Sequence, residues 1–310
     1  MVRHRSGADL RMGREVVMGD LGYFKVEQQA RQRHGDLFRV APCTEMINSY
    51  LGTFSYVDPY EKAPAVEERA AARTVVVGVD DLPAGRVAVD QAAIEAKLLG
   101  SALLIVHAGA PRHPSLLDGL VQRVRLLAPD LEVTTRVTAG MRPAEMLLST
   151  AGENDLIVVG HRQGFARRTL RRSVAERVVA QHPGPVLVVR RAGWPLPPEL
   201  EYRPLLVGMR GSAASSRAYE FAVAEAQARG CDIVVLHVVP GPVEVPEWLD
   251  WRGGVAVWNR TVAGNPVNEL VDAAGRADAM VLGRSAGRGR LGSVDRAVLH
   301  HGRCPVFFVG

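Results

Sequence analysis

The chain has 310 residues, 47% hydrophobic and 5% aromatic, and carries a formal net charge of +5. This length suffices for two domains with a buried core each, and the scarcity of aromatics requires cores of Val, Leu, Ile and Ala. The sequence contains no apolar run near the roughly 18 residues of a membrane-spanning helix, and its basic start lacks the apolar segment of a secretory signal. We therefore expect a cytoplasmic protein without a membrane partner.

Arginine supplies nearly all of the positive charge, but the excess is small and spread along the chain. No recognised nucleic-acid-binding motif accompanies it, so the sequence favours a phosphate-bearing small molecule over DNA or RNA. Cys43, Cys231 and Cys304 are far apart and form neither a CxxC pair nor a metal-ligand pattern. We expect free thiols in a reducing compartment and no metal site.

Short aliphatic runs in the first half predict five buried strands, at 74–80, 102–107, 131–137, 155–160 and 185–190. Helices are expected at 85–99, at 139–151 and from 174 onward. The first helix stops at Gly100, and Pro143 lies in the first turn of the second, where its missing N–H costs nothing. The stretch between the second and third strands is interpreted as a linker.

The same order returns in the second half, with strands expected at 205–210, 232–238, 254–262, 278–283 and 305–310. The fourth strands are the most alike, DLIVVG in the first half and DAMVLG in the second. Between the halves, residues 191–203 break regular structure with three prolines. Strands that alternate with helices predict a parallel sheet with helices on both faces and right-handed crossovers.

Residues 1–72 join neither half. They hold a large share of the aromatic residues, which is uncommon in a fully disordered tail. Two interpretations stay open. The segment is either a partly folded cap that packs on one repeat, or an upstream stretch translated from an early start codon, with Met12, Met18 and Met46 as alternative starts.

In a doubly wound sheet, ligands bind beyond the carboxyl ends of the strands. Asp80 ends the first strand, Ala108 follows the second, and the loop from Gly160 to Ser173 leads from the fourth strand into a helix. Free N–H groups and the helix dipole favour phosphate at such a helix N-terminus. The arginines of this loop also suit an anion, although a solvated helix face is the alternative interpretation.

These segments together resemble the universal stress protein family. The resemblance rests on VVVGVD at 75–80, the IVHA turn, RPAEMLL, VVGHRQGF, Ser173-Val174 and GPVLVV at 184–189. It implies a tandem member of the actinobacterial type, with two α/β domains of the adenine nucleotide alpha hydrolase-like (Rossmann-like) fold. Each domain would be a doubly wound five-stranded parallel sheet, at 73–191 and 203–310, behind an N-terminal extension at 1–72. The resemblance also implies pairing of the domains through their last strands within one chain, with a homodimer as an alternative assembly.

Many members of this family bind ATP through an Asp after the first strand and a loop of the form G-x2-G-x9-G-(S/T), whereas others lack the loop and do not. Asp80 stands at the Asp position, Gly160 at the first glycine and Ser173 at the phosphate-contacting hydroxyl. The second glycine is displaced to Gly164. Arg172 replaces the third, where it either blocks close approach of the backbone or supplies a charged phosphate contact. The resemblance thus implies a site for ATP, with or without Mg²⁺, formed by Asp80, Ala108, Gly160, Arg162, Gly164, Arg172, Ser173 and Val174.

The second half departs further from this pattern. Arg210 stands where the Asp is expected, and the loop from Gly283 to Ser293 is shorter, so it cannot reach around a triphosphate in the same way. We expect little or no ATP binding there, and a role as pairing partner for the first domain.

The leading hypothesis is a cytoplasmic regulator of the stress response that binds ATP mainly in its first domain and is not an efficient enzyme. The chain lacks a G-x4-GK-[ST] loop, a GxGxxG turn and a G-x-S-x-G motif, and its residues do not suggest a general base beside a nucleophilic water. The alternative is a degenerate scaffold that binds no nucleotide and acts through an unknown protein partner. Slow ATP hydrolysis rests on fold analogy alone.

For the histidines and tryptophans outside this pattern, we consider structural roles before functional ones. His107 is expected to pack or to line the cleft, and His161 either contacts an anion or lies exposed in its loop. His300 is expected to stabilise a helix C-terminus. Trp248 and Trp251 precede the third strand of the second half, where packing onto a helix is expected and a sheet-edge cover or partner patch is the alternative.

Overall fold

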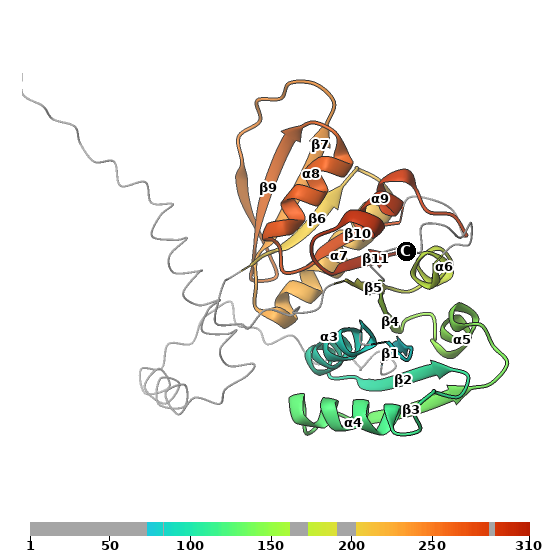
Figure 1. Ribbon diagram of the computed structural model, residues 1–310. Helices are drawn as coiled ribbons and strands as arrows, with labels where there is room; N and C mark the ends of the chain where they lie inside the picture. Colours follow the sequence, from blue (N-terminus) through green and yellow to red (C-terminus); the bar gives the residue numbers. More distant parts are fainter. Residues whose placement is uncertain (1–72, 83, 162–172, 191–202, 285–288) are drawn as a thin grey trace, which may run out of the picture.

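The computed structural model describes residues 73–82, 84–161, 173–190, 203–284 and 289–310. The N-terminal extension and most of the glycine loop therefore lie outside the described residues. The described chain folds into two α/β repeats, the first from β1 to β5 and the second from β6 to β11 (Figure 1).

The first repeat is a parallel sheet in the order β3-β2-β1-β4-β5. Its elements are β1 (Thr74–Val79), α3 (Ala84–Leu99), β2 (Ala102–Ala108), α4 (Leu116–Leu127), β3 (Val133–Thr138), α5 (Pro143–Thr150), β4 (Leu156–Gly160), α6 (Val174–Gln181) and β5 (Val186–Val189). The predicted strands and helices are present, with shifts of one or two residues at most of their ends; α5 begins at Pro143, four residues later than predicted.

The second repeat follows the order β11-β10-β6-β7-β9-β8. Its elements are β6 (Leu205–Met209), α7 (Ala213–Arg229), β7 (Ile233–Val239), β8 (Trp248–Arg252), β9 (Val255–Ala263), α8 (Pro266–Ala273), the 3₁₀ turn Ala274–Arg276, β10 (Met280–Gly283), α9 (Ser293–His301) and β11 (Val306–Val309). Helix α7 ends at Gly230, which adopts the left-handed conformation with φ 65°.

The two repeats share one sheet of eleven strands, because β5 and β11 pair antiparallel at its centre. Every residue of these two strands is buried, so their backbone groups need partners inside the protein. The pairing of last strands that the family resemblance implied is thus present within this chain (Figure 1).

Helices cover both faces of the sheet, as predicted from the alternation of elements. One buried cluster joins the sheet to α3, α4 and α7, and a second joins it to α5, α6, α8 and α9. Val, Leu, Ile and Ala dominate both clusters, which agrees with the low aromatic content. None of the described helices is long and apolar enough to cross a membrane.

The sequence interpretation was wrong about the segment before each third strand. In the first repeat this segment holds α4, whose Leu117, Leu120 and Val124 are buried at helical spacing. In the second repeat it holds β8, which turns into β9 through Gly253 and Gly254. Both glycines have positive φ, 57° and 80°, as a two-residue hairpin turn requires. The second repeat therefore has six strands rather than five, and its sheet is not wholly parallel.

Candidate functional site

The carboxyl ends of β1, β2 and β4 lie at one edge of the first repeat. Strand register sets Val79 beside His107 and Gly78 beside Val159, so Asp80 lies level with Ala108 and one residue beyond Gly160. All three residues are half-buried. The structure thus brings together three of the candidate residues from separate parts of the sequence.

Asp80 helps to shape the turn between β1 and α3. Its Oδ1 accepts a hydrogen bond from the Leu82 N–H at 3.1 Å, a local bond typical of Asp in turns. Gly85 packs closely behind it, since a Cβ there would lie 3.4 Å from the Asp80 carbonyl oxygen. The carboxylate is therefore held by the turn between β1 and α3, at the edge where the ligand was predicted.

Asp81 joins two loops of this edge, a role that the sequence interpretation missed. Its Oδ1 accepts from the Arg112 N–H at 2.9 Å, and its Oδ2 lies 3.7 Å from Arg112 Nε. Buried His107 donates from Nδ1 to the Gly109 carbonyl at 2.7 Å, with Nε2 3.8 Å from Asp81. His107 thus supports the β2–α4 loop by packing, one of its two expected roles.

Ser173 is the N-cap of α6. Its Oγ accepts from the Glu176 N–H at 3.1 Å, and the Glu176 carboxylate accepts from the Ser173 N–H at 2.9 Å, which forms a capping box. Ser173 is exposed, and the adjacent Val174 is 38% exposed. The Ser173 oxygen thus accepts a hydrogen bond from the helix, and a hydroxyl of this kind can also donate its proton. The other candidates, Arg162, Gly164 and Arg172, lie outside the described residues.

His161 is not exposed in its loop, which was one of its two expected roles. Its ring is half-buried and meets His300 of α9 edge-on at 5.5 Å between ring centroids, and its buried Nδ1 has no hydrogen-bond partner among the residues that the structure describes. Burial, together with the charge of Arg190, lowers the pKa of His161 to about 4. The imidazole is therefore neutral at pH 7 and lies between the two repeats.

The edge of the second repeat equivalent to the candidate site is closed by its own residues. A Cβ at Gly283 would collide with the Ala214 carbonyl, so the end of β10 lies directly against the first turn of α7. Arg210, at the position of Asp80, reaches Asp295 of α9 at 3.8 Å. Both contacts occupy the region where the first repeat keeps a half-buried carboxylate.

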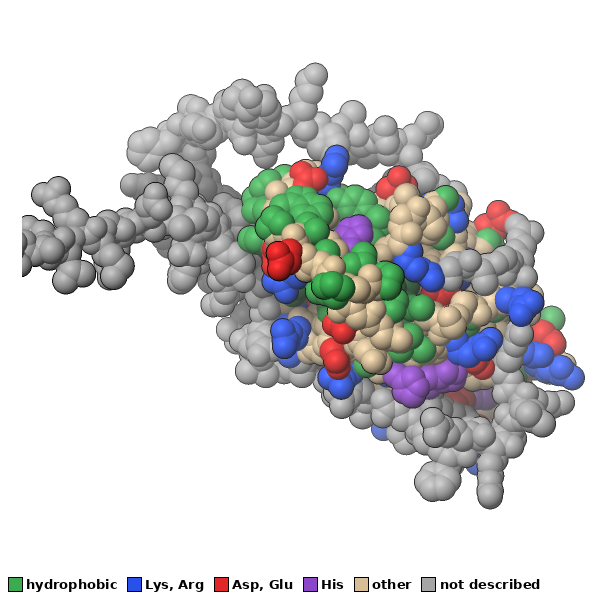
Figure 2. Space-filling model, turned by 90° about the horizontal axis from the view of Figure 1, so that it is seen from above, with side chains coloured by type: hydrophobic (Ala, Val, Ile, Leu, Met, Phe, Trp, Pro, Cys, Tyr) green, Lys and Arg blue, Asp and Glu red, His purple; other side chains and the backbone are tan. Residues whose placement is uncertain are grey.

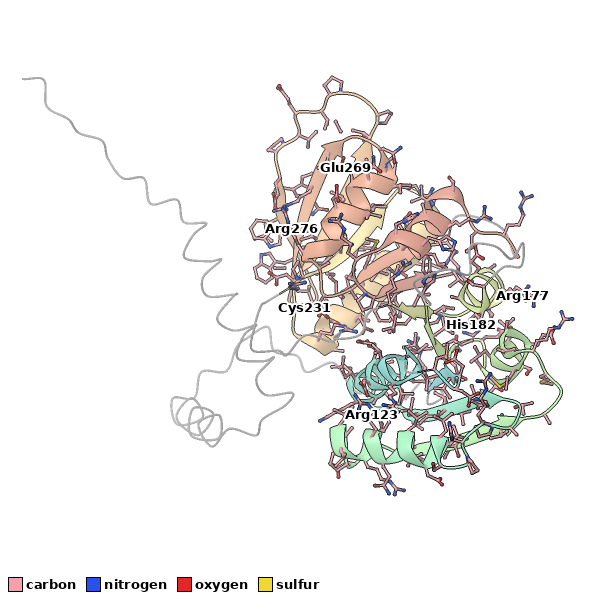
Figure 3. The ribbon with its side chains drawn as sticks, viewed as in Figure 1. Arg123, Arg177, His182, Cys231, Glu269 and Arg276 are labelled. Carbon is pink, nitrogen blue, oxygen red and sulfur yellow. The ribbon has the colours of Figure 1, made fainter. Side chains whose placement is uncertain are left out.

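Arg284, the residue after β10, is used to hold the first repeat. Its guanidinium donates to the carbonyls of Val179, His182, Pro183 and Gly184 at the C-terminus of α6. His182 ends this helix (Figure 3). Positive charge is favourable at a helix C-terminus, so the first residue of the short loop is committed to the contact between repeats.

The α6 helix is also tied to α9 through Glu176. The Oε1 atom of Glu176 lies 3.2 Å from His300 Nε2 and 3.9 Å from Arg296 Nε. His300 therefore contacts the first repeat as well as ending its own helix. Because Glu176 belongs to the capping box of Ser173, the candidate phosphate-binding end of α6 is connected directly to the second repeat.

On the opposite face, a buried polar cluster joins α3 to α7. Arg229 Nη2 donates to Glu95 Oε1 at 2.5 Å, its Nε donates to Glu225 at 2.9 Å, and its Nη1 donates to Asp278 at 2.9 Å. Burial, against the opposing charge of Arg229 and with a smaller contribution from the nearby Glu225 carboxylate, raises the pKa of Glu95 to about 8. Burial also raises the pKa of the Cys231 thiol, and it raises the pKa of the Cys304 thiol to about 12.

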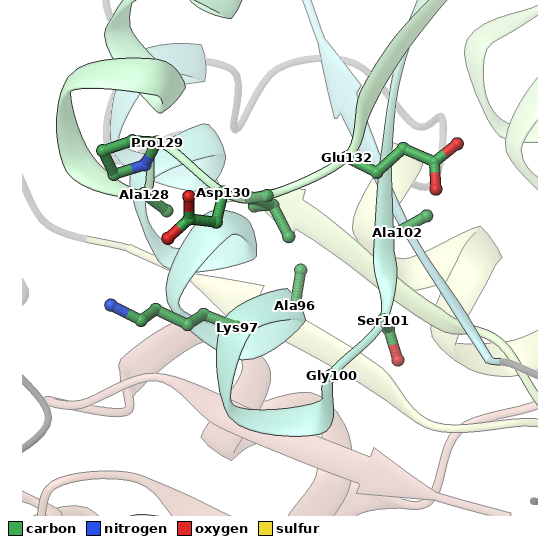
Figure 4. A pocket seen from close by; sticks show the side chains of 10 residues that line it. Ala96, Lys97, Gly100, Ser101, Ala102, Ala128, Pro129, Asp130 and Glu132 are labelled. Atoms are coloured by element: carbon green, nitrogen blue, oxygen red, sulfur yellow. The ribbon is translucent and has the colours of Figure 1, made fainter.

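A cavity of about 320 Å³ lies at the opposite edge of the sheet from the candidate site. It is bounded by Lys97 and Gly100 before β2 and by Asp130 and Glu132 before β3 (Figure 4). Since ligands of such sheets bind at the carboxyl ends of strands, this cavity is not the predicted crevice.

Within the described ranges, no group of three or more His, Cys, Asp or Glu residues could hold a metal ion.

The profile of the universal stress protein family matches residues 71–190 and 201–247. The chain belongs to this family. Among curated proteins, it is 28% identical to the universal stress protein Rv1996 of Mycobacterium tuberculosis, with 75% of this chain and 93% of the relative covered. It is 29% identical to Rv2623 of the same organism, with 75% and 94% covered.

Among solved structures, a universal stress protein from Archaeoglobus fulgidus superposes with a TM-score of 0.55 at 16% identity, covering 77% of this chain and 99% of that one. At this identity the likeness concerns the fold. The two matched segments fall on the two repeats, so this is a tandem member of the family.

Proposed function

We propose that this tandem universal stress protein is a regulator that binds an adenine nucleotide in its first repeat and does not turn it over efficiently. The observation that supports the proposal is that Asp80, Ala108 and Gly160 lie at one edge of the first repeat, with Ser173 at the N-terminus of the helix that follows β4. A carboxylate accepts hydrogen bonds from the hydroxyl groups of ribose or from the amino group of adenine. The free N–H groups at a helix N-terminus bind phosphate. Cytoplasmic location and a role in the stress response belong to the same proposal.

The chemistry of the described residues fits such a ligand. Ser173 and Val174 present exposed backbone at the first turn of α6, and Ser173 keeps a hydroxyl proton for a phosphate oxygen. Asp80, Ala108 and Gly160 are half-buried and therefore partly accessible. ATP would supply the anion that the arginines of the loop could bind; Arg162, Gly164 and Arg172 remain candidates on sequence grounds.

Confinement of binding to the first repeat is also part of the proposal. It is supported by three features of the second repeat: the ion pair of Arg210 with Asp295, the contact of Gly283 with Ala214, and the commitment of Arg284 to α6. Each places protein atoms or a cation where the first repeat has its candidate site. The second repeat would act as the structural partner.

Isothermal titration of ATP with Mg²⁺ into the full chain tests this function. We expect micromolar affinity and about one site per chain, with binding lost in Asp80→Ala and retained in Asp130→Ala, which changes an exposed carboxylate at the opposite edge. Two sites per chain, or equal binding by both variants, would contradict a site confined to the first repeat.

The alternative is a scaffold that acts through a protein partner without nucleotide. The engagement of Ser173 in a capping box favours it, because the hydroxyl already has a structural role. The absence of binding heat at millimolar ATP would support the scaffold, and a search for protein partners would then follow. Phosphate release no greater than that of a protein-free control would exclude slow hydrolysis.

A further inference from the structure

The eleven-stranded sheet ends differently on its two sides. At one end lies β3, whose Thr134, Thr135 and Arg136 are exposed, as is usual for an edge strand that resists pairing. At the other end lies β8, which pairs with β9 and has no second neighbour among the strands that the structure describes. β8 has the sequence Trp-Leu-Asp-Trp-Arg, with only one central carboxylate and one terminal guanidinium.

The surface around β8 is unusually apolar. Val245, Trp248, Leu249 and Trp251 are 46%, 46%, 42% and 51% exposed, and they make up four of the ten large hydrophobic side chains that are exposed among the described residues. Figure 2 shows hydrophobic side chains gathered on the side of the molecule where Figure 1 places the β7–β8 segment and β9. The expectation that the tryptophans pack onto a helix is therefore wrong. An exposed patch of this kind on a sheet edge marks an interaction surface.

Strand β8 distinguishes the second repeat from the first. The first repeat has α4 at the corresponding place in the chain, where its apolar residues are buried. The second repeat has an extra strand there, which pairs with β9.

The backbone of β8 determines how another strand could pair with it. The Trp251 N–H donates to the Asp250 side chain at 2.8 Å instead of to β9, so it lies on the outer side of the strand. In an antiparallel ladder, the backbone N–H and C=O groups of every second residue point to the same side of the strand. Leu249 and Trp251 therefore direct their backbone groups outward, while Trp248, Asp250 and Arg252 face β9.

We propose that β8 pairs antiparallel with β8 of a second copy of this chain, about a two-fold axis that passes through Asp250. A continuous sheet requires outward-facing residues to pair with outward-facing residues, which sets Leu249 opposite Trp251 of the second copy. The same register sets Trp248 opposite Arg252 of the second copy, where a guanidinium can lie over an indole face.

The charges of the strand can be balanced in this register. The two Asp250 carboxylates face each other at the axis, which by itself opposes pairing. A guanidinium close to each carboxylate offsets this repulsion, since Arg252 Nε lies 3.2 Å from Asp250 Oδ2 within one chain. In the pair, each Asp250 also lies diagonal to Arg252 of the other copy. The strand is therefore complementary to itself, and a two-fold pairing closes without exposing a new edge.

Sedimentation velocity on the full chain tests the pairing. We expect a dimer that dissociates to the monomer in Leu249→Lys and in Trp251→Lys, with dissociation constants raised about tenfold or more. Leu126→Lys, which changes an exposed leucine of α4, is the matched control and should remain dimeric. Far-UV circular dichroism establishes that each variant is folded.

The register has its own test in a disulfide. Residue 250 would face its own copy in a non-hydrogen-bonded pair, about 4.5 Å between Cα atoms, which is within the range that a disulfide spans. In a Cys43→Ser background, Asp250→Cys should form a disulfide-linked dimer on oxidation, whereas Arg136→Cys on β3 should not. This variant does not depend on the lysine substitutions, so a fold defect in those cannot decide the result.

Three outcomes would overturn the proposal. The wild-type chain could be monomeric up to about 100 μM, a concentration at which even weak specific dimers form. A dimer could persist in both lysine variants and resist cross-linking at residue 250, which would place the interface elsewhere. Deletion of residues 1–72 could convert a monomer into a dimer, which would show that the chain's own extension occupies the edge.

Discussion

Arg229 Nη2 lies 2.5 Å from Glu95 Oε1, although the two residues are 134 positions apart and belong to different repeats. Both side chains are buried, with 6% and 0% of their side-chain surfaces exposed. Their bond joins α3 to α7 on one face of the sheet, while Arg284 and Glu176 join the repeats on the other face. The two repeats are therefore held by polar contacts on both sides of the β5–β11 pair.

Removal of the Arg229 cation should destabilise the chain strongly. In Arg229→Met, Glu95 and Glu225 lose their guanidinium partner inside the protein, so we expect the free energy of unfolding to fall by about 3–5 kcal/mol. The control is Arg123→Met, whose partner Asp90 lies near the surface, and which should cost about 1 kcal/mol or less. Urea unfolding followed by circular dichroism measures both. Similar losses in the two variants would show that the buried cluster contributes no more than a surface pair.

The raised pKa of Glu95 predicts a pH dependence of stability. Its pKa rises from 4.5 to about 8 on folding because the carboxyl is buried. Between these values the unfolded chain has released the proton and the folded chain retains it, so stability falls as the pH rises through this window. Glu95→Gln mimics the protonated form and should gain stability relative to the wild type as the pH goes from 5 to about 8.5.

The control for this titration is Glu145→Gln, which changes an exposed glutamate of α5 and should leave the pH profile of stability unchanged. A profile of Glu95→Gln parallel to that of the wild type would mean that Glu95 is ionised in the folded protein throughout the range.

Arg284 should contribute more to stability than its position in a loop suggests. Its guanidinium bonds to four carbonyls at the end of α6. Because hydrogen bonds to charged groups contribute roughly 1.5–3 kcal/mol each and act here as a group, we expect Arg284→Met to lower the free energy of unfolding by about 3 kcal/mol. Arg290→Met, an exposed arginine of the same loop, should change it little. Equal losses in the free energy of unfolding of Arg284→Met and Arg290→Met, measured by chemical unfolding, would contradict the role assigned to Arg284.

Substitutions of Ser173 separate its structural role from the proposed role in nucleotide binding. Ser173→Ala removes the N-cap of α6 and should cost about 1 kcal/mol of stability. Ser173→Asp keeps a capping oxygen but brings a negative charge to the proposed phosphate position, so it should retain stability and lose affinity for ATP.

Ser212→Ala is the matched control, because Ser212 caps α7 in the second repeat in the same way. It should lower the thermal stability and leave ATP affinity unchanged. If Ser173→Asp bound ATP as tightly as the wild type, Ser173 would be a helix cap only.

The arrangement of strands and helices could be predicted because their signals are local. Buried strands are recognised in the sequence as short aliphatic runs. Helix α7 ends at Gly230, where only a residue that tolerates positive φ fits easily. The candidate site could be predicted for a related reason: Asp80 follows β1, Gly160 ends β4, and parallel strands end at one edge. Helix α4 was missed although its buried leucines have helical spacing, because it was treated as a linker.

Residues whose role depends on distant partners could not be assigned in this way. From the sequence, His161 is a histidine of a loop, yet its ring is half-buried against His300 of the other repeat. This burial lowers its pKa. Trp248 and Trp251 were expected to pack onto a helix because large aromatic side chains usually pack, but their place in a hairpin at the end of the sheet leaves them exposed. Nothing in their immediate neighbours distinguishes these outcomes.

By itself the sequence determined that the chain forms two α/β repeats of one family, with an Asp and a capped helix at the carboxyl edge of the first. Periodicity and turn residues act over a few positions and can be read directly. Only the tertiary structure decided that Arg284 and Arg229 hold the repeats together and that β8 is left as an apolar edge. Those outcomes depend on which surfaces meet when β5 pairs with β11, and such contacts join residues more than 100 positions apart.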